Sequence, residues 1–299
     1  MAPFIAGRDT ICLSDSIEDY PEGIVIPVDK PYRWTSADVI RKIKYCACRH
    51  FGKKNLKVGH AGTLDPLATG VLLVCIGKAT RMAEEYQRHD KEYVAGISFG
   101  ATTPSYDLEK EIDRLYPTDF VSEENLRKVL PGFLGEQEQV APLFSAKSVD
   151  GMRAYELARK AYRQSKDDPE GFDHSLAECL SRQQIRIDSL ELLGFWPEGK
   201  PSGKPEGEAS EKTEAEETDP RNLRIHVTDN SALHLPHADI RIACSKGTYV
   251  RALARDLGEA LSSGAHLDAL CRTRTGGFCI SQALSPDDAV ALFNTEKPA

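Results

Sequence analysis

A single carboxylate stands in a loop of small residues within residues 58–74, which read VGHAGTLDPLATGVLLV. Asp65 follows a Gly-His-Ala-Gly sequence and comes shortly before a strongly apolar run. Aspartate before proline is a common turn former, because Pro66 fixes its own φ and biases Asp65 toward an extended backbone. The loop is therefore either an ordinary turn or the mouth of a site where one carboxylate acts as a base or nucleophile.

Five basic or aromatic side chains elsewhere in the chain could assist such a carboxylate. They are Lys30, His60, Tyr93, Tyr249 and Arg251. Each residue type also has a plain structural interpretation: a solvated turn lysine, half-buried tyrosines in strands or caps, and an arginine on a helix surface. Taken one at a time, these residues do not predict a function.

Several familiar site patterns are missing from the sequence. GVLLVCIGKAT (residues 70–80) ends in Gly-Lys like a phosphate-binding loop, but six residues separate Gly70 and Gly77 where four are required. Ala79 also replaces the required serine or threonine. No HExxH, GxSxG or dinucleotide-binding glycine pattern occurs, so hydrolase and dehydrogenase interpretations lack their usual motifs.

Composition predicts a globular protein of one large domain or two modest ones. The chain has 299 residues, of which 40% are hydrophobic and 28% charged. No apolar run is long enough to span a membrane and the acidic start lacks a signal-peptide pattern, so we expect no membrane segment. The eight cysteines form no CxxC pair, which indicates reduced thiols in a cytosolic protein. His234 and His237 have no second ligand pair nearby, so we interpret them as part of a loop before a strand and expect no metal.

The acidic net charge of −8 is concentrated in two segments. Residues 197–220 hold eight acids and three lysines, and residues 1–23 hold five acids and one arginine. The rest of the chain then carries a net charge of +1. Any polyanionic partner must therefore be bound by local arginines and lysines rather than by a global field.

Mixed strand and helix patterns predict an α+β fold with antiparallel strands. Strands are expected at residues 23–31, 70–77 and 91–100, and helices at 36–50, 123–130, 153–162, 248–264 and 286–293. Ser36 is expected to cap its helix, in which Tyr45 is counted among the apolar positions. The polar segment 197–220 reads as a disordered insert between two paired strands, 182–196 and 221–230.

Taken together, these segments resemble the TruB-type tRNA pseudouridine synthases. VGHAGTLDPLATGVL resembles the family's catalytic loop, VDKPYRWTS its first motif, KEYVAGISFG its tyrosine strand and SKGTYVRALARDLGEALSSGAHLDALCR its arginine helix. APLFSAKSVDGMRAYELAR resembles the segment after the family's RNA-clasping insert. The resemblance runs in the family's order over residues 24–272.

The resemblance implies a pseudouridine-synthase fold, with a mixed, mostly antiparallel sheet flanked by helices. It implies one catalytic domain over residues 24–299, behind the acidic segment 1–23. The implied activity is conversion of uridine 55 in the T arm of tRNA to pseudouridine, in a cytoplasmic monomer. The isomerisation adds no group and no electrons, so no cofactor is expected. A tRNA-binding folding helper that acts without catalysis is the alternative, and a carboxylate-using sugar hydrolase would need a second acid.

Three residues carry the implied chemistry. Asp65 takes the place of the family's nucleophilic aspartate, either attacking C1′ or removing the 2′ proton. The resemblance puts Arg251 beside Asp65, where its guanidinium keeps the carboxylate ionised. Tyr93 corresponds to the tyrosine that stacks on uracil and provides a route for removing the C5 proton.

Four further residues receive substrate or supporting roles from the resemblance. His60 matches the histidine that helps to hold the flipped-out nucleotide arrangement, which the reaction requires because a stacked base cannot reach a buried carboxylate. Tyr249 and Leu270 match substrate contacts, and Lys30 matches a supporting lysine near the site.

Two departures from the family pattern concern RNA binding. The family tends to have an arginine pair after the leucine, whereas this chain has Leu270-Cys271-Arg272. Only twenty-nine residues follow Leu270, too few for the carboxy-terminal RNA-binding domain of many members. We therefore expect no such domain and a larger role for the catalytic domain's own basic residues.

Overall fold

A computed structural model describes residues 2–144, 148–149, 152–153, 158, 160, 162, 182–200 and 225–293. Most of the predicted helix at 153–162 and the acidic insert beyond Lys200 lie outside the described residues. The chain divides into two compact units, one formed by Met1–Tyr93 with Cys271–Ala299 and the other by Val94–Leu270. The boundaries fall inside two strands, β5 (Lys91–Phe99) and β13 (Ala265–Thr275), so each of these strands contributes to both units.

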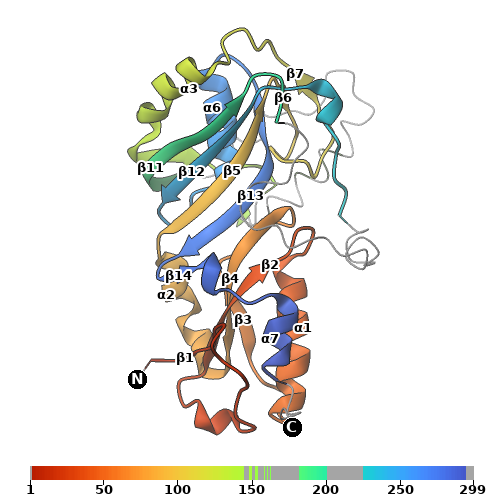
Figure 1. The fold of residues 1–299 in the computed structure, drawn as a ribbon, viewed down its shortest axis with the longest axis vertical. Helices are drawn as coiled ribbons and strands as arrows, with labels where there is room; N and C mark the ends of the chain where they lie inside the picture. Colours follow the sequence, from red (N-terminus) through yellow and green to blue (C-terminus); the bar gives the residue numbers. More distant parts are fainter. Residues whose placement is uncertain are drawn as a thin grey trace. The chain divides into compact units, whose positions relative to one another are not determined.

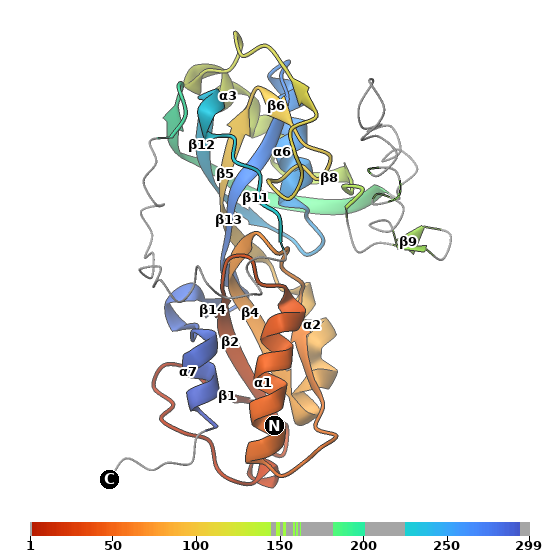
Figure 2. The same ribbon diagram turned by 90° about the vertical axis from the view of Figure 1, so that its right-hand side faces the viewer.

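The first unit combines a small sheet with helices (Figures 1 and 2). Its strands run in the order β1-β2-β4-β13, while β3 pairs with β4 and β14 with β13. The bounds are β1 (Phe4–Ile5), η1 (Ile17–Asp19), β2 (Ile24–Lys30), α1 (Ser36–His50), β3 (Val58–Ala61), β4 (Ala68–Ile76), η2 (Gly77–Met82), α2 (Ala83–Arg88), β14 (Phe278–Cys279), η7 (Ile280–Gln282) and α7 (Pro286–Ala291). Helices α1 and α7 lie side by side in both views.

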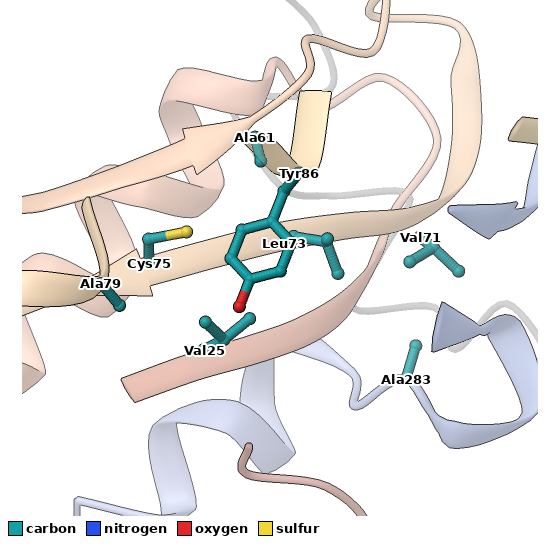
Figure 3. Packing of buried hydrophobic residues seen from close by; sticks show 8 residues of the cluster. All are labelled: Val25, Ala61, Val71, Leu73, Cys75, Ala79, Tyr86 and Ala283. Atoms are coloured by element: carbon teal, nitrogen blue, oxygen red, sulfur yellow. The ribbon is translucent and has the colours of Figure 1, made fainter. Parts of the chain in front are cut away.

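Strand β4 is buried on both of its faces, as its continuous apolar sequence predicts. Val71, Leu73 and Cys75 point to one face, where Tyr86 of α2 packs with Val25 of β2 (Figure 3). The intervening residues of β4 point to the opposite face, because side chains alternate along a strand. A strand held from both sides is a rigid support for the loop that precedes it.

Helix α1 begins and ends where the sequence predicts, but its first turn differs in detail. Thr35, not Ser36, is the N-cap: its side chain accepts from the Asp38 backbone N–H, and Asp38 reaches back to the Thr35 backbone in a capping box. The prediction that Ser36 caps this helix is therefore wrong. Tyr45 does not belong to the buried stripe either, because its exposed fraction is 63%.

The second unit is a twisted sheet with helices α3 and α6 (Figures 1 and 2). Its strands run in the order β13-β5-β12-β11-β8. The bounds are β6 (Ala101–Thr102), β7 (Arg114–Leu115), α3 (Glu123–Val129), η3 (Leu130–Phe133), β8 (Gly135–Val140), β9 (Ser148–Val149), β10 (Met152–Arg153), β11 (Arg182–Trp196), η6 (Ser231–Leu233), β12 (His237–Cys244) and α6 (Val250–Ala260). Ser122 caps α3 through the Asn125 backbone N–H.

The first strand of the hairpin predicted around the acidic insert pairs with strands other than the predicted one. Strand β11 pairs antiparallel with β12 on one side and with β8 on the other. Residues 225–230, the described part of the predicted partner, contain no strand and do not pair with β11. Instead the Thr228 backbone N–H donates to the Leu108 carbonyl at 2.8 Å. Alternation predicts a half-buried strand but does not specify which neighbour it joins.

A buried histidine in the second unit lies between two carboxylates. His237 contacts Asp239 through Nε2 and Asp268 through Nδ1, each at 2.8 Å. Burial alone would lower the pKa of His237, but its bonds to Asp239 and Asp268 outweigh burial and raise it to about 9. Lys200 completes the network through Asp239 at 2.5 Å.

The α+β prediction is confirmed. The pairings β2–β4, β3–β4, β8–β11, β11–β12 and β13–β14 are antiparallel, and β1–β2 is parallel. In the part of the chain that the structure describes, no helix combines the length and apolar character needed to cross a bilayer.

Candidate active site

The loop that carries Asp65 connects β3 to β4 in the first unit. The Ala68 backbone N–H donates to the Asp65 carbonyl at 3.1 Å, which closes a tight turn through Pro66. Gly62, where the chain leaves β3, has a φ of +88°, a conformation that side chains other than glycine rarely adopt. Leu64 and Leu67 are buried on either side of the partly exposed Asp65. The turn interpretation of this segment is thus correct, and it is compatible with a site.

Ser36 fixes the loop immediately before Asp65. Its hydroxyl donates to the Leu64 carbonyl at 3.1 Å and accepts from the Leu64 backbone N–H at 2.9 Å. Both bonds are buried, and the exposed fraction of Ser36 is only 3%. One side chain therefore satisfies both main-chain groups of the residue that precedes the carboxylate.

Lys30 holds the other side of the same loop. Its ammonium donates to the carbonyls of Pro31 at 2.8 Å, Trp34 at 2.6 Å and Pro66 at 3.2 Å. The side chain is completely buried, so the interpretation of Lys30 as a solvated turn lysine is wrong. Burial lowers the pKa of Lys30 to about 7, and the nearby negative charge of Asp65 opposes this shift.

Arg272 is a third buried anchor that the sequence analysis did not single out. Its Nε donates to the Val71 carbonyl at 2.8 Å and its Nη2 to the Gly62 carbonyl at 3.1 Å. The exposed fraction of this arginine is 2%. Because Gly62 precedes Asp65 and Val71 follows it, one guanidinium joins both ends of the loop.

Gly70 shows how closely β13 approaches the loop. A Cβ added at Gly70 would lie 2.2 Å from the Arg272 carbonyl oxygen, and the φ of Gly70 is +99°. The Gly70 backbone N–H also donates to the Asp29 carboxylate at 3.1 Å. The glycine in the LATG sequence was the available signal that another backbone passes close by.

His60 lies on β3, five residues before Asp65. Burial, and secondarily the positive charge of Arg272, lower the pKa of its imidazole below the usual value. The ring is therefore neutral at physiological pH. Among the described residues, no hydrogen-bond partner reaches its buried Nδ1.

Tyr93 and Leu270 lie at the boundaries between the units. Tyr93 is the last residue of the first unit on β5 and is 8% exposed, whereas Leu270 is the last residue of the second unit on β13 and is half-buried. Neighbouring residues within the first unit connect these strands, since the Thr273 hydroxyl donates to Glu92 at 2.9 Å.

Arg251 and Tyr249 belong to the second unit, at the start of α6. The Arg251 guanidinium donates to the carbonyls of Ser105 and Phe144, each at 3.0 Å, and its Nε lies 3.7 Å from the Asp107 carboxylate. Its exposed fraction is 4%, so the plain interpretation of Arg251 as a charge on a helix surface is wrong. The Gln139 side chain holds the backbone of Tyr249, accepting from its N–H at 2.8 Å and donating to its carbonyl at 3.2 Å.

The structure thus assembles Lys30, His60 and Asp65 within one unit, joined by Ser36 and Arg272. The pairing of Asp65 with Arg251, which belongs to the other unit, stays a prediction. What the first unit can do chemically is to hold one carboxylate on a fixed backbone near a buried lysine, with a neutral imidazole on the strand that leads into the loop. Such a fixed carboxylate suits a reaction in which an oxygen must be placed accurately against an electrophilic carbon or a proton.

Comparison with known proteins connects this loop to one group of enzymes. Residues 49–171, which include the Asp65 loop, match the family described as TruB family pseudouridylate synthase (N terminal domain). The chain is 46% identical over 269 residues to a tRNA pseudouridine synthase B of Bacteroides thetaiotaomicron, covering 90% of this chain and 92% of the relative. It is 36% identical over 277 residues to a protein of the same name from Deinococcus radiodurans, covering 92% and 79%.

Solved structures with the same fold come from Cbf5 complexes. A Cbf5-Nop10-Gar1 complex contains a chain that is 24% identical, with a TM-score of 0.55, over 97% of this chain and 63% of that one. The archaeal box H/ACA Nop10-Cbf5 complex gives a TM-score of 0.51 at 23% identity, over 91% and 54%. These likenesses support the fold that the sequence predicts.

Proposed function

Because this chain belongs to the TruB family of pseudouridylate synthases, we propose that it converts uridine 55 in the T arm of tRNA to pseudouridine. The name shared by the curated relatives, tRNA pseudouridine synthase B, supports tRNA as the substrate. The position of the uridine comes from the family resemblance of the loop around Asp65. We further propose that the enzyme acts as a cytoplasmic monomer.

The fixed main chain around Asp65 is the observation that carries this proposal. Ser36, Lys30 and Arg272 hydrogen-bond to main-chain atoms on both sides of this aspartate and are all nearly or fully buried. Anchors of this kind favour catalysis, because a carboxylate held in place does not have to be reorganised during the reaction.

The isomerisation adds no group to the substrate, so its main chemical requirement is a correctly placed carboxylate. The bond from the ribose C1′ to N1 of uracil breaks, the base turns, and a bond from C1′ to C5 forms before C5 loses its proton. Asp65 is proposed either to attack C1′ or to remove the 2′ proton during bond cleavage. Tyr93 and Arg251 are the further catalytic candidates, and the base must first leave the RNA stack, which costs a few kcal/mol.

Substrate and supporting roles are proposed for four residues. The neutral imidazole of His60 would act as a hydrogen-bond donor or acceptor for the flipped-out arrangement, rather than as a cation. Tyr249 and Leu270 would contact the substrate. Lys30 would act through the loop, because its hydrogen bonds go to main-chain carbonyls.

Position-resolved pseudouridine mapping tests the proposal. Unmodified tRNA is incubated with the wild-type protein, with Asp65→Asn and with Asp287→Asn. The last variant is a matched control, since the exposed Asp287 carboxylate pairs with Lys42 on the surface of the same unit. We expect pseudouridine at one T-arm position from the wild type and the control, and at least a thousandfold slower formation from Asp65→Asn.

Each other outcome contradicts a named part of the proposal. Equal product from wild type and Asp65→Asn would remove the carboxylate from the mechanism. Tight tRNA binding without product from any variant would favour the RNA folding helper. Release of free uracil would indicate a sugar hydrolase instead.

A further inference from the structure

Helix α1 and the loop after it present a cluster of exposed basic side chains. A hollow of about 440 Å³ on the first unit is lined by Lys44, Lys54, Asn55, Leu56, Lys57, Val58, Gly59 and Thr80. The three lysines are exposed, and no aspartate or glutamate lines the hollow. The lining therefore combines positive charge with the Asn55 amide, which can donate hydrogen bonds, whereas the Thr80 hydroxyl already donates to the Gly77 carbonyl at 2.8 Å.

A second hollow continues the same surface along the helix. It measures about 570 Å³ and is lined by Arg41, Lys44, Tyr45, Cys48, Arg49, Gly52 and Lys54. Lys44 and Lys54 line both hollows, so the two are adjacent. The Arg49 guanidinium lies 5.6 Å from the ring centre of the exposed Tyr45. An aromatic ring among cations is typical of surfaces that bind RNA.

The lysines that line the first hollow differ in ion pairing from the other basic residues nearby. Arg41 pairs with Asp38, Lys42 with Asp287 and Lys53 with Glu18. By contrast, across the residues with described coordinates, no carboxylate lies within ion-pair distance of Lys44, Lys54 or Lys57. The chain has a net charge of −8, but within its described part this local positive surface has no acidic partner at ion-pair distance.

The position of the hollow relates it to the Asp65 loop. Val58 and Gly59 line it, and His60 is the next residue of β3. Asp65 is the sixth residue after Gly59, so their Cα atoms are at most about 22 Å apart. At about 3.4 Å of axis per phosphate, the spacing of one strand in B-form DNA, this span corresponds to roughly six nucleotides.

We infer that Lys44, Lys54 and Lys57 bind the phosphate backbone of the substrate RNA within a few nucleotides of the uridine that enters the site. This inference rests on the proposed function and assigns part of the RNA interface. Phosphate oxygens would accept from the three ammonium groups, and binding would release counterions from the RNA. Contacts of this kind fix the register of the RNA without reading its sequence.

Salt-dependent binding tests the inference. Dissociation constants for unmodified tRNA are measured between about 50 and 200 mM salt in the Asp65→Asn background, which prevents turnover. The test variant is Lys54→Gln/Lys57→Gln. The matched control is Arg127→Gln/Lys128→Gln, which removes two charges that are also exposed but pair with glutamates on helix α3.

We expect the test variant to bind tRNA at least about fivefold more weakly at the lower salt. The slope of log K against log salt should fall by about 1.4 to 1.8, or 0.7 to 0.9 for each lost contact. The control should change the slope by less than about 0.5. In the catalytic form, the same two substitutions should raise KM and leave kcat unchanged, since neither lysine belongs to the candidate active site.

The two hypotheses fail in distinguishable ways. If wild-type protein makes pseudouridine but the test and control variants share one affinity and one slope, the inference about the lysines is wrong. If the test variant shows the predicted loss of slope but the wild type makes no pseudouridine, the proposed function is wrong while the interface stands. A thermal midpoint equal to the wild type's checks that the exposed substitutions leave the fold intact.

Discussion

Ser36→Ala tests whether the anchored loop controls the reaction. The substitution removes one hydroxyl that bonds both the carbonyl and the N–H of Leu64. Leaving a buried main-chain group unpaired costs about 1 to 3 kcal/mol. Since two groups lose one partner and the loop can relax, we expect the free energy of unfolding to fall by roughly 2 to 3 kcal/mol.

Ser36→Ala should also slow catalysis, because Leu64 is the residue immediately before Asp65. A displacement of about 1 Å at a reacting group can reduce the rate on the order of a hundredfold. We therefore expect the single-turnover rate of pseudouridine formation at saturating tRNA to fall by roughly tenfold to a hundredfold. The dissociation constant for tRNA should stay within about twofold, because Ser36 is buried and does not contact solvent.

Ser122→Ala supplies the control for stability alone. Ser122 also bonds a backbone N–H, that of Asn125 at 3.2 Å, but it does so as the cap of α3 in the other unit. Its loss should lower the free energy of unfolding by about 1 kcal/mol and leave the rate unchanged. A Ser36→Ala protein with the wild-type single-turnover rate would refute the view that this anchor positions Asp65.

Two further predictions concern stability. His237 has a folded-state pKa of about 9, above its unfolded value of about 6.5. Its protonation therefore stabilises the fold fully below pH 6.5, and up to about 3 kcal/mol is lost as pH rises through 9. Chemical denaturation of wild type and His237→Gln should show this as a difference that shrinks over that range, and a constant difference would contradict it. Gly70→Ala would place a Cβ 2.2 Å from the Arg272 carbonyl oxygen at a φ of +99°, so we expect a loss of at least about 3 kcal/mol or no soluble protein. Gly132→Ala, where a Cβ has nothing within 4 Å, should unfold at nearly the wild-type temperature; equal midpoints for both alanine variants would contradict the predicted clash.

Local patterns predicted the elements that surround the site. The apolar run of β4 and the periodicity of α1 gave bounds within two residues of those observed. Both signals are local, because the burial of a strand or of one helix face determines the pattern of apolar residues within a short segment of sequence. The Asp65 loop was found for a different reason, namely that its residues resemble those of one enzyme family.

Long-range contacts were not predictable in the same way. Arg272 reaches Val71 and Gly62 across about two hundred residues of sequence, and no local pattern distinguishes it from a surface arginine. The role of Ser36 was misassigned because a serine at the start of a helix fits a cap, while the neighbouring Thr35 fills that position. The partner of β11 was wrong because alternation carries no information about pairing.

Two buried bases give the pH dependence of stability opposite signs. The pKa of Lys30 is lowered to about 7 in the fold, below its unfolded value of about 10.5, so its burial becomes less unfavourable as pH rises across that interval. His237 has the opposite effect, because its stabilising contribution is lost as pH rises from 6.5 to about 9. The two contributions to the free energy of unfolding therefore partly cancel in the wild type, and only substitution can separate them. Asp65→Asn removes a negative charge that raises the pKa of Lys30, so this variant should shift the pKa of Lys30 further down. Activity and unfolding of Asp65→Asn must consequently be compared with the wild type at one pH, preferably above 8. Lys30 is then mostly neutral in the folded protein, so the loss of the Asp65 charge affects the free energy of unfolding less than it affects the reaction.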